Sequence, residues 1–400
     1  MCWGKALLAA LCLVMALAAP ASAQVEPRMF IPNLTFPAGI AFADDGSMYF
    51  TERAGSIRVV RDGRLDSDPV ARIPTTDDAE MGLLGIAVEP GSDPSIYVFA
   101  TDPSGATNRV LRIGPNGGEP EVVLDGLDAS GYHNGGGVAF SDGHLYVSHG
   151  EVHESSRAQD PNTLGGKVYR LTPDGDIPDD NPFGDSPAFA IGLRNPFGLT
   201  IDPVTGLPFV TTNGPESHDE VERLVPGGNY GWPDVSGPAP SGFDSEALTG
   251  EYHDPLLDYP EIIVPTGIAF AHPDEAQKRF AGDLFFGSFG EGAIHRVELN
   301  EDRDEAVGDE IFVDEEEPVV AVAWGPGGLY YSTPTAIKLI PMAGRGNDDR
   351  SGPASPPEPP LGAPEEPEST FPTWPVALAL IVVAGGLIFV AWRITRRGRA

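Results

Sequence analysis

Cysteine is almost absent from this sequence of 400 residues, which contains only Cys2 and Cys12. Both lie in or beside the apolar stretch Ala6–Ala19, which precedes the small-residue pattern Ala21-Ser22-Ala23. This arrangement is typical of a secretory leader, so residues 1–23 are predicted to be a signal peptide. The mature chain would then contain no cysteine, which excludes disulfides and thiolate metal sites.

Basic residues are also scarce, with 25 lysines and arginines against 59 aspartates and glutamates. All the acidic residues lie between Gln24 and Phe371, together with only 20 of the basic ones, which gives this part a net charge of about −39. Such a surface repels nucleic acid and favours cations or neutral ligands. We therefore expect no nucleic-acid partner.

A third absence is helical periodicity, which no long stretch shows apart from the two apolar ends. In its place the chain repeats a glycine-led apolar tetrad at intervals of 46 to 69 residues. The copies are Gly39–Phe42, Gly85–Val88, Gly137–Phe140, Gly198–Ile201, Gly267–Phe270 and the degenerate Ala321–Trp324. Repeats of this length indicate a stacked or closed array of similar units.

Each unit has the same internal order. A turn rich in Asp, Gly or Pro follows the tetrad, then a short aromatic strand such as Met48–Thr51, then an apolar run carrying a base such as Ile57–Val59. Short strands between such turns are joined as antiparallel hairpins. Six units of three or four strands predict an all-β, six-bladed β-propeller over residues 30–345. A β-solenoid is the alternative, but its repeats are shorter and more regular.

The C-terminal end carries the pattern of a membrane anchor. Residues 372–393 include an uncharged apolar run flanked by Trp374 and Trp392, and four arginines follow. This predicts one transmembrane helix over 372–393 and a basic cytoplasmic tail over 394–400. Residues 346–371 are rich in Pro and Glu and are predicted to be a disordered stalk. The protein is thus expected to be secreted and anchored in the cell membrane, with the propeller outside.

The unusual polar residues gather at one end of the predicted propeller. In a meander, segments before the first strand of a unit and after its second strand lie on the same face. The residues in such segments are Glu52, Glu80, His133, His149, Arg194, Asn195 and the loop Gly214–Glu220. We call this face the mouth and expect binding or chemistry there, because loops on a rigid scaffold commonly carry function.

Each of these residues also has a purely structural interpretation. His133 could be a hydrogen-bonding turn residue rather than a base, and Arg194 with Asn195 could tie down a loop. His149, Glu151 and His153 alternate along an extended stretch, which suggests a metal site, although three ligands are one short of a closed tetrahedral set.

The segment Gly214–Glu220 combines exposed carbonyls with Asp219 and Glu220. These hard oxygen ligands suit calcium better than a transition metal, while a turn with solvated acids is the alternative.

Several longer motifs resemble those of the glucose/sorbosone dehydrogenase family, which includes soluble quinoprotein glucose dehydrogenases and aldose sugar dehydrogenases. The similarity runs from about Phe36 to Met342. It rests on Gly82–Gly85, His133–Gly136, Asp160–Lys167, Gly192–Pro196 and Gly227–Pro233. The resemblance implies a six-bladed propeller that oxidises a sugar or polyol with pyrroloquinoline quinone (PQQ) and calcium.

The resemblance also implies roles for individual residues. His133 matches the base that takes the proton of the sugar hydroxyl. Arg194 and Asn195 match residues that hold the quinone, and Glu80 is expected to contribute to the cofactor site. The carbonyls of Gly214 and Pro215 resemble calcium ligands, and Glu220 with the Tyr230 carbonyl resembles a second calcium site. The electron acceptor is not identified by the sequence.

Some positions depart from the family pattern. Tyr132 replaces the polar residue that usually precedes the histidine, and the loop Ser288–Glu291 has no lysine for the cofactor. Glu315–Glu317 stand where arginines usually receive the PQQ carboxylates. These departures leave open an alternative function, a non-catalytic, calcium-stabilised propeller that binds a ligand or protein and has lost the quinone site. A metal-dependent, lactonase-like propeller using Glu52 and His149 is a third possibility.

Overall fold

The protein is described by a computed structural model that covers residues 25–344. The predicted signal peptide (1–23), stalk (346–371), transmembrane helix (372–393) and tail (394–400) lie outside the described residues. Within 25–344, no helix has the length and apolar character needed to cross a membrane.

The described residues form an all-β propeller, as the sequence predicts, with two short 3-10 helices at Ser155–Gln159 and Ser245–Ala247. Between residues 25 and 344 the strands make six sheets. The first three in chain order contain the following strands: β2 (Pro37–Phe42), β3 (Met48–Glu52), β4 (Ser56–Arg61), β5 (Arg64–Leu65) and β6 (Ala71–Arg72); β7 (Leu83–Val88), β8 (Ile96–Thr101), β9 (Thr107–Ile113) and β10 (Glu121–Asp128); β11 (Val138–Ser141), β12 (His144–His149), β13 (Lys167–Leu171), β14 (Ala188–Ile191), β18 (Gly228–Asn229) and β19 (Glu251–Tyr252).

The other three sheets complete the ring. Their strands are β15 (Pro196–Ile201), β16 (Pro208–Thr212), β17 (Asp219–Arg223) and β20 (Leu257–Tyr259); β21 (Pro265–Phe270), β22 (Leu284–Ser288), β23 (Ala293–Leu299) and β24 (Ala306–Asp314); β25 (Val322–Gly325), β26 (Gly328–Thr333), β27 (Ala336–Pro341) and β1 (Arg28–Ile31). Each tetrad of the sequence lies in or immediately before the first strand of one sheet.

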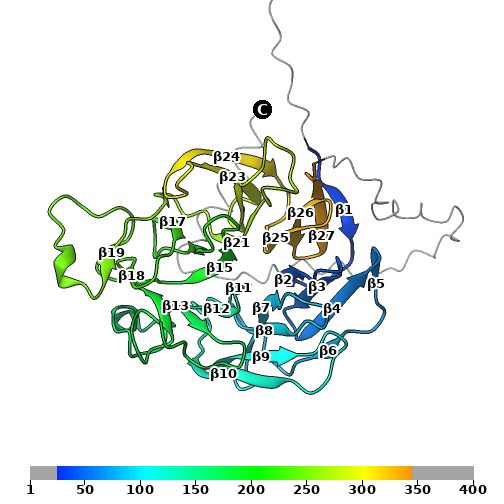
Figure 1. Cartoon of the computed structure of the whole chain (residues 1–400), viewed down its shortest axis with the longest axis horizontal. Helices are drawn as coiled ribbons and strands as arrows, with labels where there is room; N and C mark the ends of the chain where they lie inside the picture. Colours follow the sequence, from blue (N-terminus) through cyan, green and yellow to red (C-terminus); the bar gives the residue numbers. More distant parts are fainter. Residues whose placement is uncertain (1–24, 345–400) are drawn as a thin grey trace, which may run out of the picture.

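The first strands of the six sheets surround a common centre. Figure 1 shows β2, β7, β11, β15, β21 and β25 gathered around the middle of the molecule. Each packs against the next, and β25 packs against β2, so the ring is closed. One sheet combines strands from both ends of the propeller, because β1 from the N-terminal end pairs antiparallel with β27 from the C-terminal end.

Close packing of these inner strands explains why the tetrads begin with glycine. A Cβ atom on Gly85 would lie 2.2 Å from the Gly136 carbonyl oxygen, and one on Gly198 would lie 2.2 Å from the Thr266 carbonyl oxygen. Neighbouring sheets are also joined by buried hydroxyls on the second strands. Thr51 donates to the Leu84 carbonyl at 2.5 Å, and in the same way Thr211 donates to the Thr266 carbonyl at 2.6 Å.

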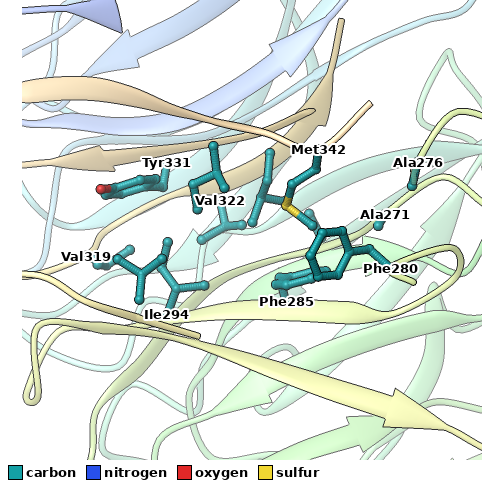
Figure 2. Packing of buried hydrophobic residues seen from close by; sticks show 13 residues of the cluster. Ala271, Ala276, Phe280, Phe285, Ile294, Val319, Val322, Tyr331 and Met342 are labelled. Atoms are coloured by element: carbon teal, nitrogen blue, oxygen red, sulfur yellow. The ribbon is translucent and has the colours of Figure 1, made fainter. Parts of the chain in front are cut away.

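Apolar side chains fill the space between adjacent sheets rather than one central core. Between the sheets of β21–β24 and β25–β27, Phe285 and Ile294 pack against Tyr331 and Met342, all fully buried (Figure 2). The glycine-led inner strands leave a channel of about 380 Å³ along the centre. The inner strands run away from the mouth, so the loops that carry the predicted site lie together at their starting ends.

Candidate active site

His133 lies at the centre of the mouth, in the turn before β11. Its backbone N–H donates to the Glu80 carboxylate at 2.8 Å. Its Nδ1 lies 2.5 Å from Oε1 of Glu151, and its Nε2 lies 3.0 Å from Nη2 of Arg194. A guanidinium can only donate hydrogen bonds, so Nε2 must carry a lone pair and the ring proton must lie on Nδ1. The contacts therefore define a neutral imidazole whose Nε2 lone pair accepts a hydrogen bond from Arg194.

Glu151 orients this imidazole and was not among the predicted active-site residues. It follows β12, it is buried, and its Oε1 also accepts the His153 backbone N–H at 3.1 Å. Burial alone would raise the pKa of Glu151, but the His133 hydrogen bond and the charge of Arg194 hold that pKa below its usual value. Glu151 is therefore an anion at neutral pH, suited to stabilising a protonated His133.

Arg194 connects the predicted base to the predicted calcium loop. Its Nη1 donates to the carbonyl oxygens of Asn213 and Gly214 at 2.8 and 2.7 Å, and its guanidinium lies 5.5 Å from the Trp232 ring. Burial lowers the pKa of Arg194, opposed by the nearby carboxylates of Glu151 and others. The structure thus places Arg194 within reach of both His133 and Gly214.

Asn195 and Glu80 both support the turn that contains His133. The side-chain oxygen of Asn195, a buried residue, accepts the Gly135 N–H at 3.1 Å. Glu80 accepts the His133 N–H, and burial raises its pKa, with that hydrogen bond acting in the opposite direction. These contacts hold the His133 turn in place. That Asn195 and Glu80 also contact a cofactor remains a prediction.

His149 does not join Glu151 and His153, contrary to the metal site suggested by their alternation. Its ring is fully buried, with Nδ1 3.2 Å from the Tyr169 hydroxyl and Nε2 2.9 Å from the Asp128 carbonyl oxygen. Burial lowers the pKa of His149 to about 4. The turn before β11 instead brings His133 to Glu151, a long-range contact for which the local sequence holds no signal.

The residues predicted to bind calcium already have hydrogen-bond partners within the protein. The Gly214 N–H donates to the Asp219 carboxylate at 2.8 Å, and the Gly214 carbonyl oxygen accepts a hydrogen bond from Arg194. Pro215 follows it in the same loop. Elsewhere, the Glu220 carboxylate accepts the Gly237 N–H at 2.5 Å, and the Tyr230 hydroxyl donates to the Arg223 carbonyl at 2.7 Å. The two groups therefore have different hydrogen-bond partners, and both calcium positions remain predictions.

Glu222 is a further acid that the sequence interpretation missed. It alternates with Glu220 on β17, so both side chains lie on the same face of the strand. Burial raises the pKa of Glu220 to about 7. Burial, and then the neighbouring Glu220, raises the pKa of Glu222 well above its usual value. Two buried carboxylates in contact either retain a proton or bind a cation, which is the donor chemistry that calcium prefers.

The opposite side of the mouth is acidic. Glu315 accepts hydrogen bonds from the Tyr331 hydroxyl and from Lys338, both at 2.7 Å, and Glu317 accepts one from the Thr335 hydroxyl at 3.0 Å. Glu291 lies 2.8 Å from Nε2 of His295. The cations His295 and Lys338 already face carboxylates here, so this side does not offer the basic residues that a tricarboxylate such as PQQ requires. On the other side of the mouth, Arg194 is a half-buried cation whose Nη1 and Nη2 donate to Asn213, Gly214 and His133.

Comparison with known proteins places these residues in a family context. A family model described as Glucose / Sorbosone dehydrogenase matches residues 34–336. Aldose sugar dehydrogenase YliI of Escherichia coli K12 is 28% identical over 347 residues, covering 80% of this chain and 92% of that protein. Quinoprotein glucose dehydrogenase B of Acinetobacter calcoaceticus is 30% identical over 258 residues, covering 54% of each chain.

A solved structure shows the same fold. The PQQ-bound aldose sugar dehydrogenase from Streptomyces coelicolor superimposes with a TM-score of 0.67 at 28% identity, covering 78% of this chain and 96% of that one.

Proposed function

We propose that this chain, which belongs to the glucose/sorbosone dehydrogenase family, oxidises a hydroxyl group of a sugar or related polyol with PQQ as cofactor. The observation that carries the proposal is the contact set of His133, whose Nε2 is unprotonated and whose Nδ1 faces the Glu151 carboxylate. A neutral imidazole held in this way is a suitable base for a hydroxyl proton at neutral pH.

The proposed roles follow from the contacts of each residue. Nε2 of His133 takes the proton of the substrate hydroxyl once Arg194, which donates to Nε2 in this structure, turns away, and Glu151 stabilises the imidazolium that forms. PQQ, when bound, supplies the oxidising equivalent by accepting the hydride from the carbon. Arg194 and Asn195 would hold the quinone side, with Glu80 supporting the turn. The carbonyls of Gly214 and Pro215 would hold calcium once Arg194, which donates to the Gly214 carbonyl in this structure, turns away from it toward the quinone.

The second calcium position is proposed at Glu220 and the Tyr230 carbonyl, where Glu222 adds another carboxylate. We also propose that the mouth faces the outside of the cell, with residues 372–393 as the membrane anchor. The substrate is then a small sugar or polyol that reaches the mouth from the external medium.

The acidic side of the mouth supports the alternative function, a calcium-stabilised propeller that binds a ligand or protein without catalysis. The carboxylates of Glu291, Glu315 and Glu317 oppose those of PQQ, and each missing charge-assisted contact is worth about 1.5–3 kcal/mol. We therefore expect PQQ to bind weakly, through the Arg194 side.

Titration of the purified protein with PQQ and calcium tests the proposal. We expect a saturable change in quinone absorbance and a further change when an aldose is added, coupled to reduction of an artificial dye. If neither PQQ uptake nor sugar oxidation occurs with calcium present, the dehydrogenase proposal fails and the binding propeller becomes the better account.

A further inference from the structure

We propose that His133, Glu151 and His153 form a binding site for a borderline divalent cation such as Zn²⁺. Their candidate ligand atoms all lie within 4.8 Å of one another. Two imidazoles and one carboxylate are the donor set of open zinc sites, in which water fills a fourth position. The site is distinct from the proposed calcium positions, because nitrogen donors favour zinc, cobalt or nickel over calcium.

The geometry indicates which atom of His133 would bind the metal. Nε2 lies 3.0 Å from the Arg194 guanidinium, whose positive charge disfavours a cation on that side. Nδ1 faces Glu151 at 2.5 Å, and the His153 ring centre lies 4.3 Å from that of His133. A cation between Nδ1 and the carboxylate would take the place of the proton that they share, and that proton would pass to solvent.

Small movements are enough to complete the coordination. Zinc–ligand bonds of about 2.0–2.2 Å place tetrahedral ligands roughly 3.3 Å apart. Nδ1 and the Glu151 oxygen must therefore separate by somewhat less than 1 Å, by the same estimate. The side chain of His153 must approach them, and it is exposed, so its ring can rotate without disturbing a packed core.

The backbone supports the view that this cluster is maintained for a function. His133, Val152 and His153 have φ angles of 61°, 48° and 66°. These left-handed conformations are costly for residues other than glycine, and most of all for a β-branched valine. Strain of this kind concentrates at functional sites. Here it brings both histidines to the same carboxylate.

A metal on Nδ1 would make Nε2, the proposed base atom, less basic, because the cation withdraws electrons from the ring and takes the Glu151 carboxylate that stabilises the imidazolium. Zinc would then inhibit sugar oxidation reversibly, a consequence that rests on the proposed function. The binding of zinc itself does not rest on it, so the two can fail separately.

The test is calorimetric titration of the purified protein with Zn²⁺ in the presence of excess calcium. We expect one tight site per chain. His153→Asn should weaken binding by at least about tenfold, as should Glu151→Gln, because each removes one ligand. Asparagine is chosen at position 153 because it tolerates the left-handed backbone there. His144→Asn removes an imidazole on the opposite face and should leave the affinity unchanged.

A second measurement guards against misfolding of a variant. The wild-type protein loaded with Co²⁺ should show the visible absorption of a four-coordinate site, and His153→Asn should lose it while keeping its circular dichroism spectrum. The proposal is overturned if the wild type shows no saturable zinc binding, or if His153→Asn and Glu151→Gln bind zinc as tightly as the wild type. Zinc binding without any sugar oxidation would sustain this site and reject the dehydrogenase.

Discussion

The buried pair Glu220 and Glu222 predicts that stability depends on pH and calcium. The pKa of Glu220 is raised from 4.5 to about 7, with burial as the main cause. Between these two pH values the folded protein retains a proton that the unfolded chain has released. Stability must therefore fall as pH rises through this window, and the raised pKa of Glu222 extends the fall above it. At 1.36 kcal/mol for each pKa unit, the loss is on the order of 3 kcal/mol.

Calcium should reverse this loss by replacing the proton between the two carboxylates. A ligand that binds only the folded state stabilises it by about 2.7 kcal/mol at a hundredfold excess over its Kd. The change that isolates the effect is Glu220→Gln, which removes the titrating group with little change of shape. Glu119→Gln is the matched control, because Glu119 is exposed in the turn between β9 and β10, on the face opposite the mouth.

Urea unfolding provides the measurement, at pH 5 and pH 7.5, with EDTA or with calcium. In EDTA, the wild type should lose about 2.4 kcal/mol more than Glu220→Gln between the two pH values, because the unfolded chain has already released most of this proton at pH 5. Calcium should restore most of that loss at pH 7.5 in the wild type alone. The reasoning is refuted if wild type and Glu220→Gln show the same pH dependence, or if calcium stabilises both equally.

Three further predictions concern the mouth. Arg194→Ala should weaken PQQ binding about 10- to 150-fold, because it removes one charge-assisted contact, whereas Arg64→Ala at an exposed position should not. Quinone absorbance gives the Kd, and equal Kd values for Arg194→Ala and the wild type would contradict this prediction. Glu317→Arg should tighten PQQ binding, because it replaces repulsion of the PQQ carboxylates with attraction, and Glu119→Arg on the opposite face should leave the Kd for PQQ unchanged. The electrostatic argument is refuted if Glu317→Arg does not lower this Kd. Glu151→Gln should reduce kcat about 10- to 150-fold with little change in PQQ affinity, because it removes a charged hydrogen bond to the base; a change confined to the Kd would show a role in cofactor binding instead.

The repeated tetrads made the fold predictable because each inner strand needs a glycine where it packs closely against the next inner strand. Gly39, Gly85, Gly198 and Gly267 all lie where a Cβ atom would collide with the next inner strand. That requirement recurs in each unit and is therefore visible in the sequence. The pairing of β1 with β27 depends instead on contact between the two ends of the propeller, and no pattern in either segment identifies the partner.

The site was predictable in its location but not in its contacts. The rule that loops before first strands and after second strands share a face correctly brought His133 and Arg194 together. It could not choose between His149 and His133 as the neighbour of Glu151, since the choice depends on a left-handed turn at His133. Glu222 was identifiable in principle, because its alternation with Glu220 on a strand puts both acids on one face.

The most direct test of the central claim is the rate of dye-linked sugar oxidation by His133→Asn, with PQQ and calcium saturating. Asparagine tolerates the φ of 61° at this position, so the turn should keep its shape. If His133 removes the substrate proton, the rate should fall about 10²- to 10⁴-fold while PQQ absorbance still reports binding, and His144→Asn should match the wild type. A His133→Asn protein that binds PQQ and oxidises the sugar at the wild-type rate would contradict the account.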